Sequence, residues 1–159
     1  MNYDGNDGDN FLLNFGSYSI IRHMNNPPLI LIVDDEENFR EIFSVEFKKA
    51  GYQTDTAVDG EDGFEKAKKI KPDLILMDME MPHLNGAGAV MKLKEDPKTK
   101  GIKVMFLTNY GDPRPEMTQA DVHFSQEVGA DDYLRKTSDM SILREEVQRV
   151  LNHVKHGEK

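Results

Sequence analysis

From Leu29 onward, short apolar runs alternate with amphipathic stretches, and this alternation is repeated five times. Short apolar runs are typical of strands buried on both faces, and amphipathic stretches are typical of helices that cover such a sheet. The pattern therefore predicts an α/β fold with a doubly wound, five-stranded parallel sheet and five helices. The predicted strands lie at Leu29 to Val33, Tyr52 to Val58, Leu74 to Met77, Val104 to Leu107, and Tyr133 to Leu134.

The helices are predicted from apolar residues at spacings of three and four. The first should run from Glu37 to Ala50 and end at Gly51, the second from near Glu61 to Ile70 before Pro72, and the third over a short stretch around Ala87 to Lys94. We expect the following residues to face the core: Phe39, Ile42, Phe43, Phe47 and Ala50 in the first helix; Phe64, Ala67 and Ile70 in the second; Met117, Ala120, Phe124 and Val128 in the fourth; and Met140, Leu143, Val147, Val150, Leu151 and Val154 in the fifth.

The regular pattern does not extend to the two ends of the chain. Residues 1–28 are rich in Asn, Asp, Gly and Ser and have no sustained period, which predicts a flexible N-terminal extension. Residues 29–154 form the predicted domain, and residues 155–159 form a C-terminal tail. A chain of 159 residues suits one such domain.

Composition excludes several classes of function. The chain has no Cys, so disulfide frameworks, thiolate metal sites and cysteine nucleophiles are ruled out. Its formal net charge of -9 disfavours direct binding to nucleic acid. No apolar run reaches the roughly 18 residues that a membrane span needs, so we expect a cytoplasmic protein.

Polar residues follow four of the five predicted strands. Asp34 and Asp35 follow the first strand, Asp78 the third, Thr108 the fourth and Lys136 the fifth. Right-handed crossovers place the loops after parallel strands on one edge of the sheet, and the first and third strands can be neighbours there. We therefore expect these side chains to converge.

Three carboxylates in one cleft repel one another unless a cation neutralises them, and Mg²⁺ prefers oxygen ligands. A carboxylate such as Asp78 can attack phosphorus to give an aspartyl phosphate. The Lys136 ammonium would neutralise charge on the transferring oxygens, and the Thr108 hydroxyl would bind one of them. The new charge would then reorganise the neighbouring surface, which describes a switch.

Each of these residues also has a purely structural interpretation. An Asp-Asp pair before a helix is often an N-cap, and Asp78 could simply begin a turn. These interpretations account for the residues singly, but not for their order at successive strand ends. Gly86 is interpreted as a turn residue, because the segment lacks the glycines of a dinucleotide-binding loop.

Four segments resemble the receiver domain of two-component response regulators, over roughly Leu29 to Val154. They are LILIVDDE from Leu29, LILMDMEMP from Leu74, LT at 107–108 and DDYLRK from Asp131. The resemblance implies a flavodoxin-like sheet with strand order 2-1-3-4-5 and a role for each matching residue: Asp78 as phosphoacceptor; Asp34, Asp35, Asp78 and the backbone carbonyl of Glu80 as Mg²⁺ ligands; and Thr108, Tyr133 and Lys136 as the residues that contact the phosphoryl group and switch.

The resemblance further implies a phosphohistidine donor on a sensor histidine kinase or a histidine phosphotransfer protein. Output would pass to a protein target through the fourth helix, fifth strand and fifth helix. Glu80 and Tyr110 would tune the lifetime of the phosphoryl group. No effector domain follows the fifth helix, so we expect a stand-alone receiver that catalyses only its own phosphorylation and dephosphorylation.

The sequence disfavours two other functions. A pseudo-receiver, which binds partners without phosphorylation, would have lost an acidic residue or the lysine, and none is lost here. A phosphatase of the haloacid dehalogenase type needs an aspartate two residues after the nucleophile, where this chain has Glu80.

The sequence departs from the receiver pattern at two places. Thr137 stands where most relatives have a proline after the lysine, so the turn that presents Lys136 is expected to differ. The stretch between Thr108 and Lys136 is longer than usual, with the excess around residues 110–115. We hypothesise that deleting this insertion would alter partner binding more than phosphorylation.

Overall fold

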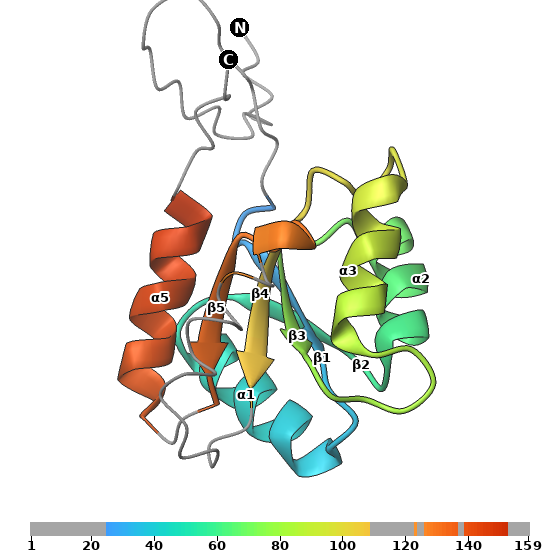
Figure 1. Ribbon diagram of the computed structural model, residues 1–159. Coiled ribbons are helices and arrows are strands. Elements are labelled where there is room, and N and C mark those ends of the chain that lie inside the picture. The colour runs from blue at the N-terminus through green and yellow to red at the C-terminus, as the bar shows by residue number, and fades with distance from the viewer. Residues whose placement is uncertain (1–24, 109–122, 124–125, 137–138, 153–159) are drawn as a thin grey trace, which may run out of the picture.

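In the computed structural model, the described residues are 25–108, 123, 126–136 and 139–152. They form one five-stranded parallel sheet with the order β2-β1-β3-β4-β5, so the expected topology is confirmed. The strands are β1 (Leu29–Val33), β2 (Gln53–Ala57), β3 (Leu74–Asp78), β4 (Lys103–Thr108) and β5 (Asp132–Arg135). The carboxyl ends of all five strands lie along one edge of this sheet (Figure 1).

Helices cover both faces of the sheet (Figure 1). Helices α1 (Glu37–Lys49) and α5 (Met140–Asn152) lie on one face, and α2 (Gly60–Ile70) and α3 (Gly86–Glu95) lie on the other. The helix expected before β5 falls mostly outside the described residues, although 123, 126 and 127 are helical. Within the described ranges, no helix has the length and apolar character needed to cross a bilayer.

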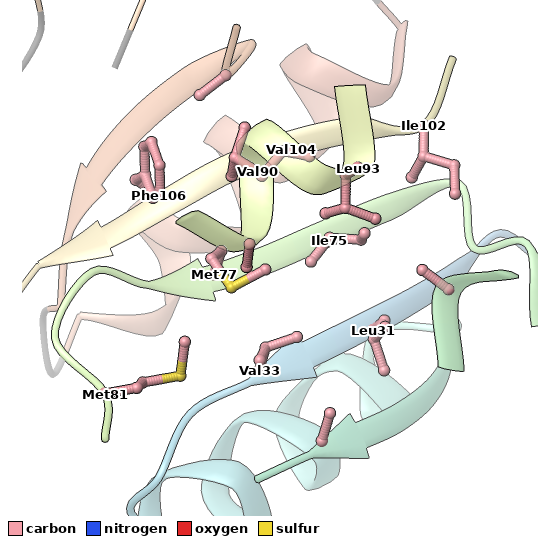
Figure 2. Close-up of a cluster of buried hydrophobic side chains, with 14 residues drawn as sticks. Leu31, Val33, Ile75, Met77, Met81, Val90, Leu93, Ile102, Val104 and Phe106 are labelled. Carbon is pink, nitrogen blue, oxygen red and sulfur yellow. The ribbon is translucent and has the colours of Figure 1, made fainter. Parts of the chain in front are cut away.

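Successive strand residues point to opposite faces, and this explains why the strands read as continuous apolar runs. Leu31, Val33, Ile75, Met77 and Phe106 pack toward α2 and α3. Figure 2 shows these strand residues together with side chains of α3. Their neighbours in sequence pack toward α1 and α5: Ile30, Ile32, Leu74, Leu76, Met105 and Leu107. The sheet therefore has an apolar layer on each side.

Three aromatic rings define the buried face of α1. Phe39, Phe43 and Phe47 follow one another at intervals of four residues, with ring centroids 3.9 and 6.1 Å apart. The prediction that Ile42 belongs to this face is wrong, because its side chain is 56% exposed. Ile42 lies about 100° around the helix from Phe43, outside the narrow stripe that the rings occupy. Ala50, the C-cap residue, is exposed as well.

The ends of two helices follow the expected signals. Gly51 adopts a φ of 93°, a left-handed conformation that glycine accommodates without steric cost, and it follows Ala50, the C-cap residue of α1. Helix α2 ends at Ile70, and the next residue, Lys71, is left-handed with a φ of 47°. The predicted stops are thus confirmed at both places.

Asp73 ties the start of β1 to the start of β3. Its carboxylate accepts from the backbone N–H of Leu29 at 2.8 Å and from the side-chain amide of Asn25 at 2.9 Å. Only 3% of Asp73 is exposed. These bonds join residues 25–28, which the sequence pattern assigned to the extension, to the folded domain.

We expect Asp73→Ala to lower the free energy of unfolding by about 1–3 kcal/mol, because it removes a buried acceptor and leaves the partly buried N–H of Leu29 without its partner. Urea denaturation would measure this loss. Asp96→Ala is the matched control: it removes a carboxylate that accepts from the N–H of Lys98 in an exposed turn, and should cost about 0.5 kcal/mol or less. Equal losses in the two variants would contradict the role given to Asp73.

Candidate functional site

Three carboxylates meet where β1 and β3 end. These strands are hydrogen-bonded neighbours, so Asp34 and Asp35, which follow β1, lie beside Asp78 at the end of β3. One carboxylate oxygen from each residue lies within 4.8 Å of the others. Asp34 and Asp78 are 0% and 2% exposed, whereas Asp35 is open to solvent. The expected convergence is therefore present, and two of the three charges are removed from water.

Asp34 is held from several sides. Its Oδ1 accepts from the backbone N–H of Glu36 at 2.9 Å, and its carbonyl oxygen accepts from the Arg40 guanidinium at 2.7 Å. The N-cap residue of α1 is Glu36, without a side-chain capping bond, so capping does not account for the Asp-Asp pair. The turn after β1 instead directs Asp34 Oδ2 into the site.

Lys136 brings an ammonium group to the carboxylates. It follows β5 directly, and its backbone N–H donates to the carbonyl of Thr108 at 2.7 Å. The Nζ atom lies 2.6 Å from Asp34 Oδ2 and 3.4 Å from Asp78 Oδ1, and the residue is only 6% exposed. Lys136 therefore reaches the site as expected. Thr137, which stands where most receivers have a proline, lies outside the described residues, so the expected difference in the turn after Lys136 stays a prediction.

The environment shifts the pKa values of this pair. Burial raises the pKa of Asp78 from 3.8 to about 7; the charge of Asp34 adds to the shift, and the Lys136 ammonium opposes it. Burial works against the charged form of Lys136, but its ion pair with Asp34 and the charge of Asp78 outweigh that cost and raise its pKa. Near neutral pH, Asp78 is therefore incompletely ionised without a further cation.

The donor set fits a divalent cation. Among the described residues, Asp34 Oδ2 is buried and makes no hydrogen bond of acceptable geometry, although it lies close to the ammonium. Mg²⁺ prefers carboxylate oxygens that converge on one site. The charge of the ion would restore the ionised form of Asp78. Asp34, Asp35 and Asp78 could hold the ion. Glu80 is exposed in the loop two residues after Asp78.

A hydroxyl pair lies at the end of the next two strands. Thr108 ends β4, beside β3, and its hydroxyl donates to the Tyr133 hydroxyl at 3.3 Å. Both side chains are half-buried, and Tyr133 lies opposite Phe106 on the neighbouring strand. The two residues expected to switch are thus in contact. Tyr110 and the insertion at 110–115 lie outside the described residues.

Gly86 contributes to the site in a way that the sequence does not predict. It is the first residue of α3, not part of a free turn, and its N–H donates to the carbonyl of Met79 at 3.0 Å. A Cβ at this position would overlap the carbonyl oxygen of Asp78 and lie 2.9 Å from the Cα of Met79. Glycine therefore allows the start of α3 to pack directly on the backbone that carries Asp78. No motif in the sequence signals this contact.

This geometry has relatives among known proteins. The family model "Response regulator receiver domain" matches residues 30–148. The chain belongs to this family. Response regulator receivers are generally phosphorylated on an aspartate and bind Mg²⁺ at an acidic pocket. Receivers interact with histidine kinases or phosphotransfer proteins and with downstream targets.

Individual receivers resemble this one over most of its length. Protein PilH of Pseudomonas aeruginosa is 35% identical over 122 residues, which cover 77% of this chain and 96% of PilH. The chemotaxis protein CheY4 of Vibrio cholerae superposes with a TM-score of 0.67 at 30% identity, and the superposition covers 77% of this chain and 98% of CheY4. The response regulator TrrA of Thermotoga maritima, solved in complex with Mg²⁺ and BeF, has a TM-score of 0.66 at 32% identity, over 77% of this receiver and 98% of TrrA.

Other relatives are longer. The transcriptional regulator RpaA of Synechocystis is 34% identical over 124 residues, which cover 78% of this receiver and 49% of RpaA. The chain thus spans about half the length of RpaA. The similarity to RpaA concerns the receiver domain alone.

Proposed function

We propose that this receiver accepts a phosphoryl group on Asp78 from a phosphohistidine donor and thereby switches a surface for protein contacts. The observation that carries the proposal is the meeting of a buried lysine with three carboxylates at one edge of the sheet. The ligands of Mg²⁺ would be Asp34, Asp35, Asp78 and the backbone carbonyl of Glu80. When bound, the ion would offset negative charge on the carboxylates and on the transferring phosphoryl group.

The residues of the chain then have separate tasks. A carboxylate oxygen of Asp78 forms the new O–P bond while the P–N bond of the donor breaks, and the electron pair of that bond returns to the imidazole nitrogen. The Lys136 ammonium lies 3.4 Å from Asp78 Oδ1, where it can neutralise charge on the phosphoryl oxygens. The Thr108 hydroxyl would donate to one of those oxygens. Glu80 and Tyr110 would limit how water reaches the product.

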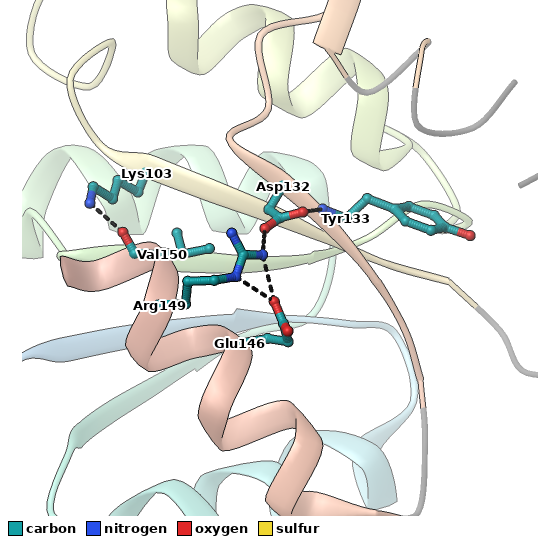
Figure 3. Close-up of polar contacts among 6 residues, drawn as sticks. All are labelled: Lys103, Asp132, Tyr133, Glu146, Arg149 and Val150. Atoms are coloured by element: carbon teal, nitrogen blue, oxygen red, sulfur yellow. Dashed lines mark hydrogen bonds and ion pairs between the residues drawn. The ribbon is translucent and has the colours of Figure 1, made fainter. Parts of the chain in front are cut away.

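The switch would pass through Tyr133. The Thr108 hydroxyl now donates to Tyr133, and a phosphoryl oxygen would compete for that donor. Release of the Tyr133 hydroxyl would change the surface formed by β5, α5 and the helix expected before β5. Arg149 on α5 binds both Asp132 of β5 and Glu146, so β5 and α5 would respond as one unit (Figure 3).

Partners follow from this scheme. The donor would be a sensor histidine kinase or a histidine phosphotransfer protein, and the target would be a protein that binds the switched surface. The net charge of -9 argues against direct contact with nucleic acid. We propose that the receiver works as a cytoplasmic switch, with no enzymatic activity beyond its own phosphorylation and dephosphorylation.

Intact-mass analysis after incubation with acetyl phosphate and Mg²⁺ tests the proposal. We expect one phosphoryl adduct on the wild type, and none on Asp78→Asn or in the presence of EDTA. A known receiver, treated in parallel, verifies the reagents. No adduct on the wild type, together with no binding of beryllofluoride, would contradict the proposal and favour a pseudo-receiver.

A further inference from the structure

The Lys136 ammonium has an aromatic neighbour in addition to the carboxylates. Its Nζ lies 4.2 Å from the centroid of the Phe39 ring. This distance is well within the range of about 6 Å over which a ring face attracts a cation. Within the described chain, Nζ makes no hydrogen bond of acceptable geometry, although Asp34 Oδ2 is 2.6 Å away. The ring therefore adds a restraint to an ammonium that is otherwise held by charge alone.

The Phe39 ring is itself fixed. It lies in the first turn of α1 and is stacked on Phe43, with centroids 3.9 Å apart and an interplanar angle of 30°. Phe43 is 2% exposed and packs on the fully buried Phe47. The next residue, Arg40, bonds to the carbonyl of Asp34. The first turn of α1 thus contacts both partners of the Asp34–Lys136 ion pair.

We propose that Phe39 is a positioning residue for phosphoryl transfer, because its ring holds the Lys136 ammonium beside Asp78. This inference rests on the proposed function. A cation over a ring face has a preferred site, whereas an ion pair without a directed hydrogen bond permits several. A fixed ammonium does not have to reorganise when charge develops on the phosphoryl oxygens. The competing explanation is that Phe39 only fills space beside the apolar layer between the sheet and α1.

Three variants separate the two explanations. Phe39→Leu removes the ring but keeps an apolar residue that favours helix. Phe39→Tyr keeps the ring face. Phe47→Leu is the matched control, because it removes another ring of the same helix that packs on Phe43 and Tyr52.

Three measurements are made on each variant. The first is the maximal rate of adduct formation at saturating acetyl phosphate with Mg²⁺, followed by intact mass. The second is the proton resonance of the Lys136 ε-methylene without donor, which a nearby ring face shifts upfield. Thermal denaturation of each variant supplies the accompanying change in stability.

We expect Phe39→Leu to slow the maximal rate about 3- to 10-fold, and to lose the upfield shift of Lys136. Phe39→Tyr should keep the rate within about twofold and retain the shift. Phe47→Leu should lose stability and keep both readouts. The proposal is overturned if Phe39→Leu keeps the wild-type rate, if its Lys136 resonance does not move, or if all three variants slow in proportion to lost stability. A wild type that forms no adduct would contradict the proposed function, while the Lys136 resonance would still decide whether the ring holds the ammonium.

Discussion

Replacing Asp78 with asparagine is expected to stabilise the metal-free protein at neutral and higher pH. The pKa of Asp78 is about 7 in the folded protein, against an ordinary value of 3.8. A carboxyl whose pKa is higher in the folded chain opposes folding once the pH exceeds its unfolded value, because the unfolded chain releases the proton first. The cost is absent below about pH 4, grows up to about pH 7 and then stays constant, at a size on the order of 2–4 kcal/mol.

Denaturant unfolding in EDTA, repeated from pH 4 to pH 8, measures this effect as the difference between variant and wild type. Asp35→Asn is the matched control, because Asp35 is exposed and its charge contributes least to the raised pKa of Asp78. Saturating Mg²⁺ should remove most of the difference, since a bound cation favours the charged carboxylates and stabilises the fold. If the free energy of unfolding had the same pH dependence in Asp78→Asn and in the wild type in EDTA, the pKa of Asp78 would not be raised in the folded protein.

Gly86→Ala is expected to disturb both the fold and the site. The added Cβ would overlap the Asp78 carbonyl and crowd the Met79 Cα, so the start of α3 must move away from β3. Overpacking against backbone, which cannot rotate aside, should cost about 2–4 kcal/mol of unfolding free energy. Because the displaced backbone carries the phosphoacceptor, the rate of adduct formation should fall with it.

Gly101→Ala gives the control for this experiment. A Cβ at Gly101 would meet no atom within 4 Å, so the change should alter stability by no more than about 0.5 kcal/mol. Urea denaturation and intact mass supply the two readouts. If Gly86→Ala were as stable and as readily phosphorylated as Gly101→Ala, the packing of α3 on Asp78 would not be needed for stability or phosphorylation.

The sheet could be predicted because its signal is local and repeated. The continuous apolar runs of β1 and β3 identify them as strands buried on both faces. The polar residues that come next mark the carboxyl ends of these strands, where ligands of parallel sheets bind. Asp34, Asp78 and Lys136 could therefore be brought together from the sequence before any distance was known. The helix stop at Gly51 rested on the same kind of local evidence.

Contacts made across the fold could not be predicted in this way. Helical spacing allows Ile42 to share a face with Phe43. The structure shows that the three rings fill the buried face of α1 and leave Ile42 exposed. Gly86 reads as an ordinary turn residue until the Asp78 carbonyl is seen against it. Phe39 was correctly assigned to the buried side of α1, yet its contact with Lys136 depends on β5, almost a hundred residues away.

The most direct test of the central claim is to locate the phosphoryl group chemically. Borohydride reduces an acyl phosphate to an alcohol, so a phosphorylated aspartate becomes homoserine, which tandem mass spectrometry can assign to one position. After treatment with acetyl phosphate and Mg²⁺, we predict homoserine at residue 78 and unmodified aspartate at 34 and 35. Homoserine at Asp34 or Asp35, or at any other aspartate with Asp78 intact, would contradict the assignment of Asp78 as the phosphoacceptor.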